Sequence, residues 1–200
     1  HLSTDAVAGR ATHRIVGGPG GVPEEVYRTL RVELGARPVA PVVEGYVRLR
    51  SLEEQPVRLL GVDAFAEPPF RNYLGTPESG VPIEAVSALI TEPNTALVSE
   101  TFAQRHGLQS GAVVQVEVGA KVVELKIVGL LRPRDDLSRR ALDGLLLAGV
   151  AAAQEVLDQT GSLSHIDLIV SPDGRVGRAT LAEIETALPP GVRVERSSAR

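Results

Sequence analysis

Ser99 and the four histidines are among the residues that could support nucleophilic or metal-assisted chemistry. Ser99 precedes His106 by seven residues, but the chain contains no Gly-x-Ser-x-Gly nucleophile motif. Glu100 and an apolar segment follow Ser99, which is the pattern of a helix N-cap with an acid in the first turn. We therefore expect Ser99 to begin a helix rather than to attack a substrate.

Two histidines, His13 and His165, lie in predicted strands that could be neighbours in one sheet. A metal site needs several convergent ligands, and no carboxylate partner for this pair can be identified. The acid pairs Glu24/Glu25, Glu53/Glu54 and Asp135/Asp136 lie at helix starts or in polar loops, where charged side chains are normally solvated. We predict no catalytic, cofactor-binding or metal site.

The glycine-rich segment 17–21, Gly-Gly-Pro-Gly-Gly, precedes a predicted helix and could be taken for a phosphate-binding loop. The Gly-Lys-Ser/Thr sequence of nucleotide-binding loops does not follow it. In addition, Pro19 lacks one of the amides that would bind a phosphate group. The prediction for this segment is a turn.

The net charge of −4 argues against nucleic-acid binding, because a domain with that function needs a basic face. The densest charge cluster, Arg132–Arg140, contains four arginines and two aspartates. The mixed signs weaken its field, so we expect a solvated connection. Contact with lipid headgroups or a partner is the alternative.

Length and composition predict a folded globular protein, either one domain or two small lobes. Apolar residues make up 43% of the 200 residues and aromatics only 3%, so valine, leucine, isoleucine and alanine must form the core. The absence of cysteine excludes disulfides and thiolate metal sites within the chain. No apolar run is long enough to span a bilayer and no signal peptide begins the chain, which we expect to be an excised segment.

Apolar periodicity predicts strands joined by short helices. In the hairpin around Gly119-Ala120, Val114, Val116, Leu125 and Ile127 should face the interior, while Gln115, Glu117, Glu124 and Lys126 face water. Segment 76–93, rich in proline, glycine and serine, is predicted to be an irregular connection. The predicted strands are 12–17, 42–49, 57–63, 114–118, 123–127, 145–150, 166–170 and 192–194, and the predicted helices are 23–34, 65–74, 99–106, 151–160 and 181–188.

The order of these elements resembles the periplasmic core domain of MacB/FtsX-type ABC transporter permeases over roughly residues 11–198. The most recognisable block is a capped helix, a Gly-Leu-x-x-Gly turn and a hairpin ending near Ile127-Val-Gly129. The stretches that carry the resemblance are Val57-Arg-Leu-Leu-Gly-Val-Asp63, Ala96–Gly111 followed by Val113–Leu131, and Ala151–Leu157 followed by Ile166–Leu168.

The resemblance implies an α+β fold of two lobes. Residues 1–75 and 137–200 would form a mixed αβ lobe near the membrane, and residues 76–136 an inserted, smaller β-rich distal lobe. Both chain ends would continue into transmembrane helices, and His1 and Arg200 would lie on the same side. Segments 12–17 and 192–195 would share one lobe, whose sheet also includes 166–170.

The resemblance also implies a function without catalysis, at the extracytoplasmic face of a bacterial cell membrane. The domain would couple ATP hydrolysis to movement or release of a lipid, lipoprotein, peptide or drug-like cargo, or to a partner outside the membrane. Its partners would be a cytoplasmic ABC ATPase subunit and an extracytoplasmic protein or second permease copy, with no nucleic acid. The alternatives are a stand-alone extracytoplasmic module that binds lipid or peptide between its lobes and, less favoured, a hydrolase.

Overall fold

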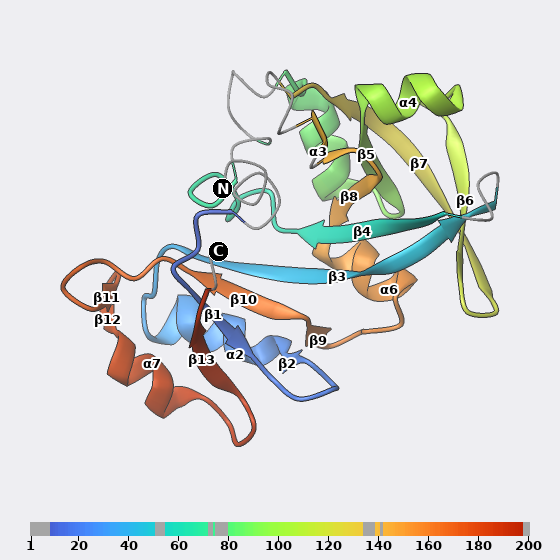
Figure 1. The fold of residues 1–200 in the computed structure, drawn as a ribbon. Coiled ribbons are helices and arrows are strands. Elements are labelled where there is room, and N and C mark those ends of the chain that lie inside the picture. Colours follow the sequence, from blue (N-terminus) through green and yellow to red (C-terminus); the bar gives the residue numbers. More distant parts are fainter. Residues whose placement is uncertain are drawn as a thin grey trace.

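The computed structural model describes residues 9–50, 55–71, 74, 80–133, 139, 140 and 142–197, and it shows a mixed α+β fold (Figure 1). The helices are α2 (Glu24–Arg28), the π-helix η1 (Thr29–Glu33), α3 (Ile83–Thr91), α4 (Glu100–His106), α6 (Val150–Val156) and α7 (Leu181–Ala187). The strands are β1 (His13–Val16), β2 (Val22–Pro23), β3 (Val39–Leu49), β4 (Pro56–Val62), β5 (Thr95–Ser99), β6 (Val113–Val118), β7 (Lys121–Leu131), β8 (Leu145–Gly149), β9 (Ser162–Leu163), β10 (His165–Leu168), β11 (Arg175–Val176), β12 (Ala179–Thr180) and β13 (Arg193–Arg196). Among the described residues, no helix has the length and hydrophobicity to cross a bilayer.

One nine-stranded sheet organises the fold, in the order β13-β1-β10-β3-β4-β8-β5-β7-β6. An additional pairing of β6 with β3 closes the last six of these strands into a ring. We call this ring the closed sheet, and β1, β10 and β13 the terminal strands. The closed sheet mixes parallel pairs, such as β4 with β8, and antiparallel pairs, such as β3 with β4.

Strand β3 belongs to both parts of the sheet. Its first residues, Val39–Val42, pair with β10, and its later residues pair with β4 and then β6. Residues 39–43 are all buried, whereas the end of the strand alternates between buried and exposed residues. The sequence therefore changes from the continuous apolar pattern of a fully covered strand to the alternating pattern of a half-solvated one.

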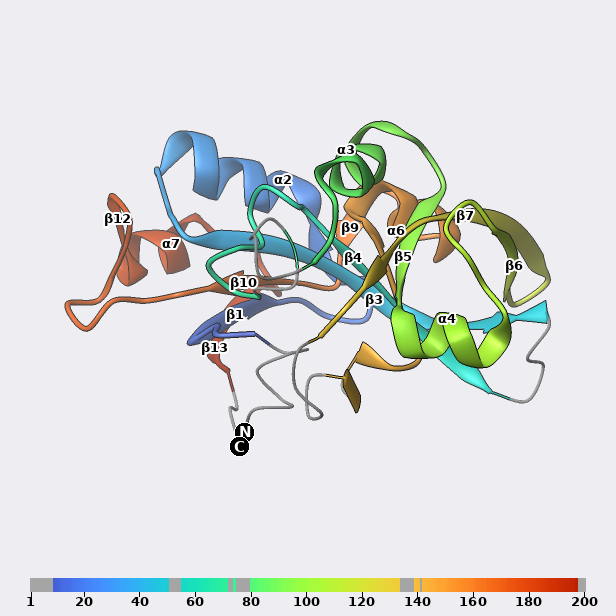
Figure 2. The same cartoon turned by 90° about the horizontal axis from the view of Figure 1, so that it is seen from above.

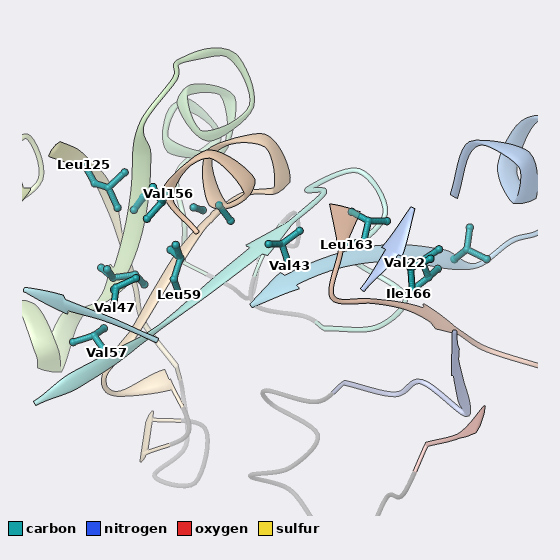
Figure 3. Packing of buried hydrophobic residues seen from close by; sticks show 14 of the residues in the cluster. Val22, Val43, Val47, Val57, Leu59, Leu125, Val156, Leu163 and Ile166 are labelled. Atoms are coloured by element: carbon teal, nitrogen blue, oxygen red, sulfur yellow. The ribbon is translucent and has the colours of Figure 1, made fainter. Parts of the chain in front are cut away.

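The hydrophobic cluster drawn in Figure 3 runs through both parts of the sheet. Ile15, Val22 and Ile166 pack among the terminal strands, Val43 lies in the middle, and Leu125 fills the closed sheet. Helix α6 approaches the sheet closely at Gly61, where an added Cβ would lie 2.3 Å from the Cβ of Ala153. Glycine is thus required at position 61 for helix and strand to pack together.

The hairpin β6–β7 confirms the predicted register. Val114, Val116, Leu125 and Ile127 are at most 7% exposed, Gln115, Glu124 and Lys126 are exposed, and Glu117 is half-buried.

The helix before this hairpin is capped as predicted. Ser99 accepts a hydrogen bond from the backbone N–H of Phe102 (3.0 Å). Gly107, at φ +66°, ends α4, and the Leu108 N–H donates to the carbonyl of Ala103 (2.8 Å). This is a Schellman C-cap, which needs a residue that tolerates positive φ.

Two expectations about segment 65–93 are wrong. The described part of 65–74 forms turns rather than a helix, because Pro68 and Pro69 lack the N–H groups that a helical ladder would use. The connection predicted as irregular contains helix α3, whose Ala85, Val86 and Leu89 are buried. The apolar stripe was missed because proline, glycine and serine residues before Ile83 favoured a loop. Residues 72, 73 and 75–79 lie outside the described residues.

The two ends of the described chain lie side by side. Strand β1 pairs antiparallel with β13 and with β10, so the predicted common sheet of 12–17, 192–195 and 166–170 is confirmed. The Ser197 N–H donates to the Thr12 carbonyl (2.9 Å), and β1 and β13 are neighbours in both views (Figures 1 and 2). The predicted positions of His1 and Arg200 lie outside the described residues.

Candidate functional site

The structure does not bring Ser99, His106 and the glycine-rich segment 17–21 together into a catalytic centre. Ser99 and His106 occupy opposite ends of α4, and His106 makes an edge contact with Phe102, with ring centroids 4.6 Å apart. The segment 17–21 folds back as a turn in which the Gly21 N–H donates to the Gly18 carbonyl (2.9 Å).

The two strand histidines do not meet. His13 lies opposite Leu168 in the register of β1 and β10, whereas His165 pairs with Val42 of β3. Within the part of the chain that the structure describes, no three histidine, aspartate or glutamate residues are placed to hold a metal ion.

A buried ion-pair cluster joins the turns after β4 to the terminal strands. Arg71 donates to both carboxylate oxygens of Glu67 (2.7 and 2.8 Å) and to Asp167 Oδ2 of β10 (2.7 Å). Arg14 of β1 and His165 of β10 approach Asp167 Oδ1 at 3.7 and 3.3 Å. Glu67, Arg71 and Asp167 are at most 3% exposed. The cluster therefore fastens segment 63–71 to both β1 and β10.

Burial acts differently on the two carboxylates of this cluster. It raises the pKa of Glu67 to about 7, although the Arg71 guanidinium opposes the shift. Burial also acts to raise the pKa of Asp167, but the His165 imidazole and the guanidinium groups of Arg71 and Arg14 outweigh it and hold that pKa below its ordinary value. Asp167 therefore stays ionised, and Glu67 is the member of the cluster that can change charge near neutral pH.

A groove of about 850 Å³ lies between the N-terminus of α2, the end of α3, the start of α6 and the residues that follow β4. We call this cavity the α2–α3–α6 groove; Figure 2 shows α2 and α3 on the same side of β3. Large apolar side chains line it, including Phe65, which is 78% exposed, and Ile90, which is 43% exposed. A cavity of this size and lining is typical of binding sites.

The charged residues of the groove are nearly all acidic. Among the described residues of the lining, Arg28 is the one basic residue, and the acids are Glu24, Glu25, Asp63, Glu92 and Glu155. They come from helices α2 and α6 and from the residues just after α3 and β4, which the fold brings together. The groove therefore presents an apolar floor with carboxylates around it.

Sequence reasoning identified neither the ion-pair cluster nor the groove. Asp167 could have been noticed as a charged residue inside an otherwise apolar strand, and Glu67 and Arg71 as an acid and a base four residues apart on either side of two prolines. No local sequence pattern indicates that Arg71 pairs with Asp167, because the two residues are 96 positions apart.

Comparison with known proteins shows what the chain is similar to. The chain is similar to the ABC transporter permease protein Rv0987 of Mycobacterium tuberculosis, with 38% identity over 196 residues, which cover 98% of this chain and 22% of the relative. The expected resemblance is thereby supported, because the chain is related in sequence to part of an ABC transporter permease. The chain spans only 22% of the length of that curated relative. No protein-family model matches it.

Two solved structures share the fold of this chain. The extracellular domain of the noncanonic ABC-type transporter YknZ from Gram-positive bacteria superposes with a TM-score of 0.59 at 13% identity, over 92% of this chain and 98% of that one. The periplasmic region of MacB from Actinobacillus actinomycetemcomitans gives 0.58 at 13% identity, over 98% of this chain and 94% of that one. One of these structures is an extracellular domain and the other a periplasmic region, and the likeness shows that this chain has their fold.

Proposed function

We propose that the domain couples ATP binding and hydrolysis by a cytoplasmic ABC ATPase to movement or release of a lipid, lipoprotein, peptide or drug-like cargo, or to a partner outside the membrane. The observation that carries this proposal is the pairing of β1 with β13. Because these strands are antiparallel, the polypeptide enters and leaves the sheet at the same place. Segments that continue from both ends can therefore act together on one sheet.

The ion-pair cluster supports transmission beyond the two end strands. Arg14 of β1 approaches Asp167, and Asp167 binds Arg71, which holds segment 63–71. That segment leads out of β4, a strand of the closed sheet, and contributes Asp63 and Phe65 to the groove. A displacement of β1 can thus reach the groove through a short series of contacts that passes through the buried Asp167 and Arg71.

Two lobes form part of the proposal. Residues 1–75 and 137–200 would lie nearest the membrane, with 76–136 inserted as the distal lobe. The insert contributes β5, β6 and β7, and it pairs with β3 and β8 of the flanking segments. The proposed distal lobe thus completes the closed sheet together with β3, β4 and β8 of the flanking segments.

A crosslinking experiment on the full transporter tests the coupling. Cysteines at Arg28 and Glu92, which line opposite elements of the groove, would be joined by short bifunctional thiol reagents in a cysteine-free background. We expect the crosslink to reduce ATP turnover of the reconstituted permease and ATPase, because it holds the groove in one state. Cysteines at Gln115 and Glu124, which face each other within the β6–β7 hairpin, form the control pair.

Full ATP turnover after efficient crosslinking at Arg28 and Glu92, equal to that of the control pair, would refute the coupling. The isolated domain should neither bind nor hydrolyse ATP. Saturable ATP binding by the isolated domain would contradict the assignment of nucleotide chemistry to a separate subunit.

A further inference from the structure

We propose that the α2–α3–α6 groove binds a short, basic, amphipathic peptide segment of a partner protein outside the membrane. The proposal rests on the proposed function only for the location of the groove on the extracytoplasmic side. Its argument comes from the charge of the lining, the exposed apolar side chains and the distribution of the carboxylates.

The charge of the molecule is concentrated at this groove. Its lining holds five carboxylates and one guanidinium, a net charge of −4. The whole chain also has a formal net charge of −4, so acidic and basic residues balance over the remainder. A cationic ligand would therefore be attracted to the groove in preference to the rest of the surface.

Three of the carboxylates are available to a ligand. Glu25, Glu92 and Glu155 are exposed, and none of the three carboxylates hydrogen-bonds or ion-pairs with another described residue. Lys121 reaches α6 from β7, but its Nζ donates to the backbone carbonyl of Glu155 (2.6 Å) and not to the carboxylate.

The other two carboxylates of the groove already have structural roles. The Gln154 side-chain amide donates to Glu24 Oε2 (3.0 Å), and the Phe65 N–H donates to Asp63 Oδ1 (2.9 Å). The groove thus presents Glu25, Glu92 and Glu155 to cations while the other two carboxylates support its walls.

The apolar part of the ligand is indicated by Phe65 and Ile90. Phe65 is 78% exposed and Ile90 43% exposed, although both are large apolar side chains lining a concave surface. Exposed apolar groups rimmed by polar ones are typical of protein-interaction sites. An amphipathic peptide would cover them with its apolar side chains while its lysines or arginines reach the carboxylates.

Other occupants match the groove less well. The remaining surface of a second copy of this chain is balanced in charge and offers no net attraction to the rim, and an anionic lipid surface would be repelled there. A small monovalent amphiphile would use a single carboxylate. Glu25 lies on α2, Glu92 just after α3 and Glu155 on α6, so the separated acids match a ligand with several cations.

Fluorescence anisotropy with the 200-residue chain tests this inference. The probe is a short, end-capped, fluorescein-labelled peptide of alternating leucine and lysine. Leucine–glutamate and serine–lysine peptides of equal length are the comparisons. We expect saturable binding of the leucine–lysine peptide, at least about ten-fold tighter than either comparison peptide and weakened by high salt.

Variants locate the binding. Combined Glu25→Gln, Glu92→Gln and Glu155→Gln should weaken binding at least about ten-fold, whereas Glu124→Gln with Glu195→Gln, outside the groove, should leave it unchanged. Phe65→Ala should also weaken binding, with Val113→Ala as the matched exposed control. Circular dichroism would establish that every variant is folded, which the exposure of these side chains favours.

Three results would overturn the inference. The first is equal affinity for the leucine–lysine and leucine–glutamate peptides, and the second is unchanged binding by the triple variant. The third is complete displacement of the labelled peptide by dodecyltrimethylammonium at a lower concentration than unlabelled peptide requires, which would assign the groove to small cations. Loss of peptide binding would not affect the crosslinking result that tests coupling. The two proposals therefore fail separately.

Discussion

Replacing Arg71 by methionine should destabilise the domain by about 3 kcal/mol. The guanidinium lies between two carboxylates that are 0% exposed and makes three short hydrogen bonds to them. Removing one partner of a buried ion pair leaves an uncompensated charge and costs about 3–5 kcal/mol. Asp167 would keep Arg14 and His165 nearby, and Glu67 can take up a proton because its pKa is already about 7. Both effects favour the lower end of that range.

Urea unfolding of the isolated domain measures this loss. A domain of this size should also melt about 6–12 °C lower. Arg58→Met is the matched control, because Arg58 pairs with Glu44 at a site where the two side chains are 37% and 30% exposed, and such pairs contribute about 1 kcal/mol or less. If Arg71→Met costs no more than Arg58→Met, the buried cluster does not hold segment 63–71 in place.

Three further changes test other parts of the structure. Burial raises the pKa of Glu67 from 4.5 to about 7, so protonated Glu67 contributes stability that is fully present below pH 4.5 and is lost, by up to about 3 kcal/mol, as pH rises through 7. Glu67→Gln should therefore flatten the decline of the unfolding free energy with pH, and parallel profiles of the two proteins would contradict the assignment. Leu125→Ala should cost about 2–5 kcal/mol, because the side chain is 0% exposed, and a loss below about half a kcal/mol would mean that the register of β7 is wrong. Ser99→Ala should cost about 1 kcal/mol in the same assay by removing the N-cap of α4, whereas an unchanged unfolding midpoint would show that the cap is dispensable.

Local patterns predicted the local structure. The β6–β7 hairpin follows from alternation on either side of Gly119-Ala120, and α4 follows from Ser99 and Gly107, because each signal lies within a few residues of the structure it specifies. That the first and last strands share one sheet was predicted from the resemblance and from the αβ pattern at both ends of the chain, but their direct pairing was not.

Features that depend on distant contacts could not be predicted in this way. Closure of the sheet through β3 and β6 requires Leu49 to lie opposite Val116, and neither residue carries a signal for the other. The cluster of Arg71 with Asp167 and the groove likewise depend on how separate segments pack. Helix α3 was missed for a local reason, because the breakers before Ile83 outweighed a short apolar stripe.

Movement of the domain during the ATPase cycle can be measured directly in the full permease with its ATPase in lipid nanodiscs. A donor dye on Glu124→Cys, exposed on β7 of the proposed distal lobe, would transfer energy to acceptor-labelled lipids, and Glu195→Cys on β13 would serve as the membrane-proximal reference. Coupling predicts that a non-hydrolysable ATP analogue changes the transfer efficiency at position 124 more than at position 195. Identical efficiencies with and without nucleotide at both positions would contradict transmission of conformational change by this domain.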